Sequence, residues 1–264
     1  MKKVRFSMKL CIIIPAYNEE NRIGATLEKY GTYFDSKIND DFDYEMLIVI
    51  NNTTDNTEDV IKKYQKRFKK IKYIRFVRGG KGFAVTEGFK YALKNEFDLI
   101  GFVDADMATR PEEYYRLFEN IGKYDGIIAS RWKPGAVHNY SLKRKIFSKG
   151  FNFAIRSLVF LPHKDTQCGA KIFTSKAIGS IVDHIAMTEW AFDINILYLM
   201  KKNKFCIKEI ATAWEDKDGS KINILRDTIK MFSAVLRLRL INSPFRIIVR
   251  AYDKLPDKIR VGAL

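Results

Sequence analysis

Short apolar runs separated by segments with helical periodicity fill the first half of the chain, and this alternation restricts the possible folds most. The five runs are Leu10–Ile14, Met46–Ile50, Ile71–Phe76, residues 98–103 and Gly126–Ala129. Pro15 is expected to stop the first strand. Helices are predicted at residues 20–35, at 57–69, from Gly82 to about Asn95, and from about Pro111. The pattern favours an α/β fold with a mostly parallel, Rossmann-like sheet, which binds ligands at the carboxyl ends of its strands.

Length, composition and charge limit the possible domain size, compartment and partners. A chain of 264 residues with 47% hydrophobic content can form one large globular domain, with or without an appendage. Three scattered cysteines favour a reducing compartment, and no signal peptide is expected. The 47 Lys and Arg residues against 31 Asp and Glu give a net charge of +16. Such a charge attracts phosphates, nucleic acid or an anionic membrane, although a solvated lysine-rich surface also accounts for much of it.

Polar motifs follow three of the predicted strands. Asp104-Ala105-Asp106 follows the fourth and offers two carboxylates of the kind that Mg²⁺ or Mn²⁺ binds, although such a triplet also occurs by chance. Asn51 follows the second, and the glycine turn at 79–82 follows the third; all three motifs are expected to meet at one edge of the sheet. The turn's main-chain N–H groups and Lys81 suit a phosphate, but taken alone these residues favour an ordinary tight turn.

Two basic amphipathic segments, 143–161 and 225–242, are predicted in the second half. In the first, Lys145, Lys149, Asn152 and Arg156 form a polar stripe, with Phe147, Phe151, Phe153, Ile155, Leu158 and Val159 on the remaining surface. In the second, Arg226, Lys230 and Arg237 lie opposite Ile229, Phe232, Val235 and Leu236. Each helix suits either a membrane interface or packing on the protein's own core. No segment has 18 consecutive apolar residues, so no transmembrane helix is predicted.

Three later motifs each have a functional and an ordinary interpretation. The carboxylate in Asp165–Gly169 suits an acceptor-orienting group or a turn, and the acids in Glu189–Asp193 suit a site or the first turn of a helix. The segment Glu215–Lys221 suits a loop that closes over phosphates or a plain surface loop.

Together these motifs resemble the family 2 glycosyltransferases of GT-A fold, and within them the dolichyl-phosphate β-glucosyltransferases and dolichyl-phosphate mannose synthases. The resemblance runs from about Leu10 to Leu240. The matching segments are Pro15–Glu20, Gly80–Ala84, Asp104–Asp106, Ser130-Arg131, Asp165–Phe173, Trp190–Asp193 and Gly219–Lys221. Two positions depart from the family pattern. Asn51-Asn52-Thr53 replaces the acidic turn that reads the base, which leaves the choice between UDP and GDP open, and Arg78 replaces an asparagine.

The resemblance implies an inverting transfer of a sugar, with glucose placed first, from a nucleotide-diphosphate donor to dolichyl or another polyprenyl phosphate. The product would feed glycan assembly or protein glycosylation. The catalytic residues would be Asp104, Asp106 and Asp165, with Mg²⁺ or Mn²⁺ bound by Asp106 and Asp104. The donor would contact Pro15, Ala16, Tyr17, Glu19, Asn51, Lys81, Asp104 and Lys221. The acceptor phosphate would contact Arg131, Arg144 and Ser148, with Gln167, Trp190 and Asp193 also in the site.

The expected organisation is a GT-A catalytic domain at 1–224, which includes the amphipathic segment 143–161, and a C-terminal basic amphipathic helical segment at 225–264. We expect a peripheral protein on the cytoplasmic face of a membrane, with no nucleic-acid partner. The alternatives are transfer of mannose or an N-acetylhexosamine, a sugar nucleotidyltransferase, and a nucleic-acid-binding protein driven by the positive charge.

Overall fold

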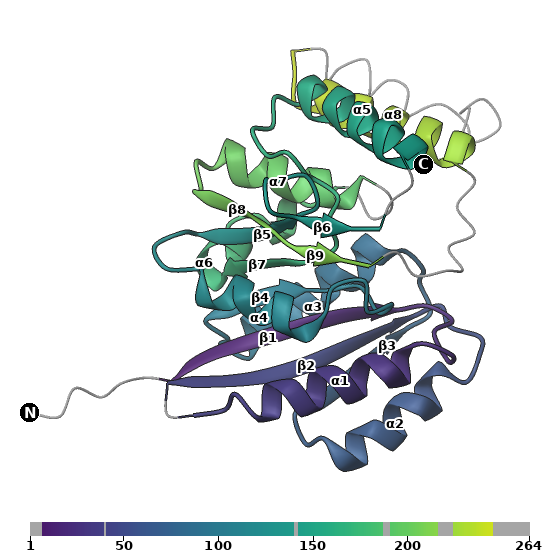
Figure 1. The fold of residues 1–264 in the computed structure, drawn as a ribbon, viewed down its shortest axis with the longest axis vertical. Helices are drawn as coiled ribbons and strands as arrows, with labels where there is room; N and C mark the ends of the chain where they lie inside the picture. Colours follow the sequence, from purple (N-terminus) through teal and green to yellow (C-terminus); the bar gives the residue numbers. More distant parts are fainter. Residues whose placement is uncertain (1–6, 40, 140–141, 187–190, 216–223, 245–264) are drawn as a thin grey trace, which may run out of the picture.

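The fold is a seven-stranded sheet with helices on both faces (Figure 1). The computed structural model describes residues 7–39, 41–139, 142–186, 191–215 and 224–244. In spatial order the strands are β3 (Ile71–Phe76), β2 (Phe42–Asn51), β1 (Met8–Ala16), β4 (Leu99–Phe102), β7 (Lys171–Thr174), β5 (Gly126–Ser130) and β8 (Ile207–Ala211). The helices are α1 (Ile23–Asp35), α2 (Thr57–Arg67), α3 (Lys81–Lys94), α4 (Pro111–Glu119), α5 (Leu142–Leu158), α6 (Ser175–Gly179), α7 (Phe192–Lys202) and α8 (Ile224–Ile241), with a 3₁₀ turn, η1, at Val182–His184. A second, two-stranded sheet pairs β6 (Val137–His138) with β9 (Ala213–Trp214).

Alternate side chains of the central strands fill two separate cores. Leu10, Ile12 and Ile14 of β1 face a cluster that includes α1 and α4. Cys11 and Ile13 face the opposite cluster, which includes α3, α6 and α7. This two-sided burial explains why the strands read as continuous apolar runs in the sequence, as is usual for parallel strands covered on both faces.

The first strand continues through Pro15 to Ala16, so the prediction that this proline ends the strand was wrong. Ile13 accepts a hydrogen bond from the N–H of Val103 (N···O 3.0 Å), beyond the end of β4. The main-chain polar groups of residues 13 and 15 point to the same side, and β4 does not extend as far as residue 15. A proline is tolerated there because no neighbouring strand requires its missing N–H.

Strand β7 was absent from the sequence-based prediction, and it is antiparallel to both its neighbours, β4 and β5. It has only four residues, and it begins with a lysine that is completely buried. Because it runs against the other strands, β7 starts at the edge where they end. The chain therefore leaves β5 and returns to β7 at the same edge of the sheet, and residues 131–170 form an excursion from that edge.

Helices α5 and α8 pack against each other in a layer apart from the sheet (Figure 1). Ile155 of α5, Val159 directly after it, and Val235 and Leu238 of α8 are buried in one core. The predicted polar stripe of α5 needs one correction, because Asn152 is only 3% exposed and faces the core. No helix in the described ranges is long and apolar enough to cross a membrane.

Large apolar residues are exposed on the two helices and just beyond the end of α5. Phe153 of α5 is 62% exposed, and Phe160, two residues beyond its end, is 64% exposed. Phe232 and Leu236 of α8 are 44% and 41% exposed. Phe153 and Leu236 were expected on the apolar faces of their helices, but these faces are wider than the core that covers them. Core packing thus accounts for the apolar residues on the buried side of each helix. It does not account for those on the exposed side. Residues 245–264 of the predicted C-terminal segment lie outside the described residues.

Candidate active site

Two buried hydroxyl groups of α1 fix the loop that carries Asp104 and Asp106. The Thr26 hydroxyl donates a hydrogen bond to the carbonyl of Ala105 (2.6 Å), and the Tyr30 hydroxyl donates to the carbonyl of Thr109 (2.9 Å). Within the loop the Asp106 carboxylate accepts a hydrogen bond from the N–H of Ala108 (2.9 Å). The two carboxylates are therefore held by the fold at the carboxyl end of β4.

Negative charge accumulates around these carboxylates. Burial and the neighbouring charge of Asp104 raise the pKa of Asp106. Burial also raises the pKa of Glu19, and Asp106 and Asp104 add to the rise, although Arg22 opposes it. The Arg22 guanidinium is bound to the Glu19 carboxylate through two hydrogen bonds of 2.8 and 2.9 Å.

A divalent cation fits this arrangement. Mg²⁺ and Mn²⁺ are usually held by one or two carboxylates together with substrate phosphates. Asp104 and Asp106 offer such oxygens, and a cation would relieve the repulsion that raises the pKa of Asp106. The described residues include no group of three or more His, Cys, Asp or Glu side chains able to hold a metal alone. The donor set therefore suits a cation that shares its ligands with a substrate.

Lys81, at the start of α3, connects Asp104 to the first turn of α7. Its ammonium lies 2.5 Å from an Asp104 carboxylate oxygen and 4.0 Å from one of Asp193. Burial alone would lower the pKa of Lys81, but the charges of Asp104 and Asp193 raise it above its ordinary value. Lys81, predicted to contact donor phosphates, thus lies beside the predicted metal site.

Lys171 completes this charged cluster and was not singled out in the sequence. It is fully buried at the start of β7, where its ammonium donates to the Asp193 carboxylate and to the Cys168 carbonyl (2.5 Å). A lysine beside the apolar pair Ile172-Phe173 was an available signal, because a buried ammonium needs an acidic partner. Two lysines thus flank Asp193, a residue that the sequence motifs had placed in the site.

Glycines allow two close approaches at this edge. A Cβ atom on Gly82 would lie 2.7 Å from side-chain atoms of Phe192. Gly80 has φ +113°, a conformation that favours glycine. Next to it, an Asn51 amide oriented by its hydrogen bonds donates to the Ala16 carbonyl (3.0 Å) and accepts from the Gly80 N–H (3.1 Å). Asn51, predicted to contact the donor, therefore ties the end of β1 to the glycine turn.

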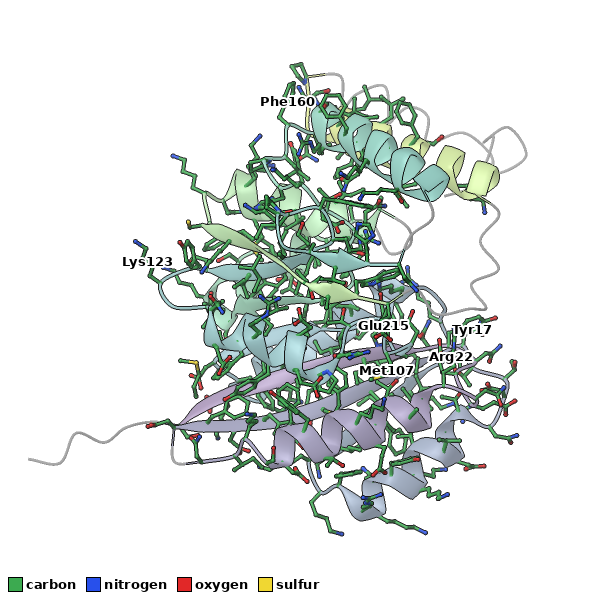
Figure 2. All side chains as sticks on the ribbon, in the orientation of Figure 1. Tyr17, Arg22, Met107, Lys123, Phe160 and Glu215 are labelled. Carbon is green, nitrogen blue, oxygen red and sulfur yellow. The ribbon has the colours of Figure 1, made fainter. Side chains whose placement is uncertain are left out.

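The loop after β1 is held by the turn after β2. The Thr57 hydroxyl accepts a hydrogen bond from the Glu19 N–H (2.7 Å), and the Asp55 carboxylate accepts one from the Glu20 N–H (3.1 Å). Tyr17, in the same loop, is 54% exposed. Figure 2 shows Tyr17 and Arg22 on the same side of the molecule as Met107, which follows Asp106. The predicted convergence of the motifs at one sheet edge is confirmed.

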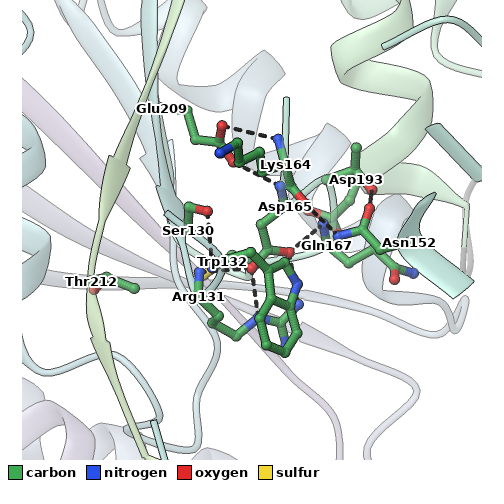
Figure 3. A network of polar contacts seen from close by, with 12 residues as sticks. Ser130, Arg131, Trp132, Asn152, Lys164, Asp165, Gln167, Asp193, Glu209 and Thr212 are labelled. Atoms are coloured by element: carbon green, nitrogen blue, oxygen red, sulfur yellow. Dashed lines mark hydrogen bonds and ion pairs between the residues drawn. The ribbon is translucent and has the colours of Figure 1, made fainter. Parts of the chain in front are cut away.

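The Asp165 loop forms a second polar cluster, around a completely buried carboxylate (Figure 3). The Arg131 guanidinium donates two hydrogen bonds to Asp165 (2.7 and 2.8 Å), and the Arg131 N–H donates a third (2.9 Å). Glu209 accepts from the N–H groups of Lys164 (3.0 Å) and Asp165 (2.7 Å). Burial alone would raise the pKa of Asp165, but Arg131 holds it below its ordinary value. An acid of lowered pKa is a weak base.

Helix α5 is attached to this loop by side-chain hydrogen bonds. Asn152 donates to the Lys164 carbonyl (2.8 Å) and accepts from the Thr166 hydroxyl (3.1 Å). Gln167, also placed in the site by the sequence, donates to the sulfur of Met231 on α8 (2.5 Å). Ser148 lies on α5, one turn before Asn152. Arg144 belongs to α5, but its side chain, like Trp190 and Lys221, lies outside what the structure describes.

The chain belongs to glycosyl transferase family 2, whose sequence model matches residues 11–181. Its relatives include dolichyl-phosphate β-glucosyltransferases. The protein of that name from Dictyostelium discoideum is 32% identical over 252 residues, which cover 87% of this chain and 73% of that protein. The one from Saccharomyces cerevisiae is 32% identical over 265 residues, covering 88% of this chain and 74% of that protein. The resemblance expected from the motifs is confirmed.

Solved structures share the fold at low sequence identity. Glucosyl-3-phosphoglycerate synthase from Mycobacterium tuberculosis, in complex with Mn²⁺, UDP and phosphoglyceric acid, aligns with a TM-score of 0.67 and 14% identity. The alignment covers 88% of this chain and 78% of that one. Mannosyl-3-phosphoglycerate synthase from Rubrobacter xylanophilus aligns with a TM-score of 0.66 and 14% identity, covering 97% and 77%. The predicted GT-A fold is confirmed.

Proposed function

We propose that this chain transfers glucose from a nucleotide diphosphate, UDP before GDP, to dolichyl phosphate, with inversion at the sugar. The supporting observation is the cluster of Asp104, Asp106 and Lys81 at one sheet edge, in a family member whose relatives at 32% identity are dolichyl-phosphate β-glucosyltransferases. Family membership favours sugar transfer over the nucleotidyltransferase and nucleic-acid-binding alternatives.

In the proposed reaction an oxygen of the acceptor phosphate forms a bond to the anomeric carbon while the bond from that carbon to the diphosphate breaks. The bonding electron pair leaves with the diphosphate. A phosphate monoester has its second pKa near 6, so the acceptor is largely ionised at neutral pH and needs no strong base. The main requirement is to hold two anionic groups in line, and positioning of this kind contributes much of the rate in such transfers.

The charged residues divide this task between them. Asp106 and Asp104 would hold Mg²⁺ or Mn²⁺, which when bound supplies Lewis-acid neutralisation of the diphosphate. Lys81 adds a positive charge at the same place. Asp165 stays ionised and orients Arg131, whose planar fork suits phosphate oxygens. Asp165 is therefore a positioning residue in this proposal, with Arg144 and Ser148 as the other acceptor contacts and Lys221 as a donor contact.

The membrane surface is the proposed partner of α5 and α8. Their exposed aromatic and aliphatic residues, together with basic residues on the same helices, suit the interfacial region of a bilayer. We place the protein peripherally on the cytoplasmic face, where the dolichyl phosphate headgroup meets soluble nucleotide sugars. The lipid tail of the acceptor would remain in the bilayer beside these helices.

A donor screen tests this function. The purified chain is incubated with dolichyl phosphate, Mn²⁺ or Mg²⁺ and radiolabelled UDP-glucose, GDP-mannose or UDP-N-acetylglucosamine, and label is counted in the organic extract. UDP-glucose is expected to give labelled lipid, and chelation of the metal to abolish it. Asp106→Ala should remove activity, whereas Asp183→Ala, an exposed acid outside the site, should not. No labelled lipid with any donor would refute the proposal, and full activity of Asp106→Ala would refute the metal site.

A further inference from the structure

A cavity of about 340 Å³ lies beside α5, separate from the cluster of Asp104 and Lys81. It is lined by Trp132, Lys149, Phe153, Arg156 and Lys164. Trp132 comes from the segment after β5, Lys164 from the segment before Asp165, and the other three residues from α5. Three cationic and two aromatic side chains thus surround one space, and no role has been assigned to it.

The positive charge of this cavity is not neutralised locally. Lys149, Arg156 and Lys164 make no ion pair with any residue in the described part of the chain. The Lys149 ammonium lies 5.5 Å from the centroid of the Trp132 ring, and the Arg156 guanidinium lies 5.5 Å from that of Phe153. Two acids near Lys164 are already engaged, Asp165 by Arg131 and Glu209 by the main-chain N–H groups of residues 164 and 165. An anion is therefore the complementary ligand.

Exposed aromatic side chains lie at the cavity and just beyond the end of α5. Phe153, which lines the cavity, is 62% exposed, and Phe160, two residues beyond the last residue of α5, is 64% exposed. The Arg239 guanidinium of α8 lies 5.1 Å from the centroid of the Phe160 ring. Exposed rings with a cation beside them thus occur both at the cavity and at the end of α5. A free phosphate would satisfy only the cations, whereas a phospholipid offers a phosphate next to an apolar chain.

The cavity borders the Asp165 loop, through Lys164 and through the hydrogen bond from Arg156 to the His163 carbonyl (3.5 Å), but its lining on α5 differs from the proposed acceptor contacts. Ser148, a proposed acceptor contact, precedes Lys149 by one residue and is rotated from it by about 100° around the helix. Asn152, one turn after Ser148, contacts the main chain of the Asp165 loop. Lys149 and Arg156, seven residues apart, lie on the neighbouring side of α5. The cavity is therefore lined by residues other than the proposed acceptor contacts Arg131, Arg144 and Ser148.

We propose that this cavity binds the phosphate of an anionic phospholipid headgroup, as a second lipid site distinct from that of the acceptor. The proposal rests on the proposed membrane-surface position of α5 and α8, but not on the transfer reaction. A bound headgroup would attach α5 to the membrane. Because Asn152 links α5 to the Asp165 loop, the attachment would also fix the orientation of the catalytic edge relative to the lipid surface.

Vesicle binding without donor or acceptor tests the site. The full chain is sedimented with vesicles of phosphatidylcholine alone or mixed with phosphatidylglycerol. The double variant Lys149→Gln/Arg156→Gln is expected to partition about 25-fold more weakly onto the anionic vesicles, about fivefold for each charge removed. The control Lys63→Gln/Lys66→Gln removes the same charge from exposed positions on α2, at the opposite end of the sheet (Figure 1), and should bind within twofold of wild type.

Further measurements distinguish a phospholipid site from a free-phosphate site and from the acceptor site. Lys149→Arg/Arg156→Lys keeps both charges and should bind like wild type, which guards against a folding defect in the glutamine variant. Equal binding of the glutamine variant and wild type would overturn the proposal. Inorganic phosphate could raise the melting temperature of wild type but not of the glutamine variant, while both bind vesicles equally. This result would assign the cavity to free phosphate and overturn the lipid assignment. If the glutamine variant has a raised KM for a short, water-soluble polyprenyl phosphate, the cavity is part of the acceptor site. That result would also overturn the proposal.

Discussion

Gly169 lies directly against the carboxylate of Asp104, and replacing it with alanine would test how closely that carboxylate must be placed. A Cβ atom on residue 169 would lie 1.9 Å from one Asp104 carboxylate oxygen and 2.5 Å from the carboxyl carbon. The backbone of Gly169 is outside the positive-φ region, so an alanine is not strained there by its own conformation. The consequence of Gly169→Ala therefore comes from displacing Asp104.

The size of the displacement follows from the contact. Moving the oxygen from 1.9 Å to a tight but tolerable 3.0–3.4 Å requires a shift of about 1.1–1.5 Å. Such a shift also disturbs the 2.5 Å contact between Asp104 and Lys81. Misplacing a catalytic group by about 1 Å costs on the order of 100-fold in rate, and overpacking costs about 1–3 kcal/mol of stability. Gly169→Ala is thus expected to fold and to lose about 100-fold in kcat/KM.

The assay compares kcat/KM for glucose transfer with the free energy of unfolding in urea. Gly150→Ala is the matched control, because Gly150 lies in α5 with nothing within 4 Å of the added Cβ atom. This control should keep full activity and gain up to about 1 kcal/mol from the higher helix propensity of alanine. A Gly169→Ala enzyme with kcat/KM within threefold of wild type would refute the reasoning, because Asp104 would then tolerate displacement.

Three further substitutions have defined outcomes. Asp165→Asn should destabilise the protein by about 3–5 kcal/mol at pH 7, because it leaves the largely buried Arg131 guanidinium, 14% exposed, without its charge partner. Since the folded-state pKa of Asp165 is lowered, its stabilisation is present above about pH 4 and fades as the pH falls through the folded-state value, so unfolding midpoints of variant and wild type should converge in acid. Thr26→Val leaves the Ala105 carbonyl without its hydroxyl donor and should cost about 1–3 kcal/mol in urea unfolding; an unchanged midpoint would contradict the role given to this bond. Lys171→Met should cost about 3–5 kcal/mol by removing the nearer of the two ammonium partners of Asp193, and adding Asp193→Leu should recover most of the loss in calorimetry.

The sequence predicted strands β1 to β5 well, because most of them are apolar on both faces and β1 to β4 are each followed by a helix. It missed β8, which is parallel to β5 and only partly buried. The third strand was placed at its observed bounds, Ile71–Phe76. The prediction failed for β7, where four residues beginning with a buried lysine carry no periodic signal. The buried side of α5 was also only partly predicted, because Asn152 is polar yet makes two hydrogen bonds in the interior.

The candidate site was predicted by position more successfully than by contact. The placement of Asp104 and Lys81 at one sheet edge followed from the alternation of strands and helices. Contacts between residues distant in the chain could not be predicted from the sequence, because they form only in the folded structure. Arg131 with Asp165 and Lys171 with Asp193 are two examples, separated by 34 and 22 residues. Such pairs depend on the antiparallel strand β7, which no local sequence pattern predicts.

The return of the chain to β7 has a consequence for how the chain can vary. The N–H of Ala129 donates to the carbonyl of Ala170 (3.0 Å), so the ends of the excursion at 131–170 are joined by a hydrogen bond. An excursion with closed ends can change in length or sequence in its middle while the sheet keeps its position, provided that Gly169, which lies against Asp104, is kept. The middle of this excursion, with α5 inside it, can therefore vary more freely than its ends, where Arg131, Asp165 and Gly169 make their contacts. Sequence changes in α5 would then alter the surface beside the site and leave the contact between Asp104 and Lys81 in place.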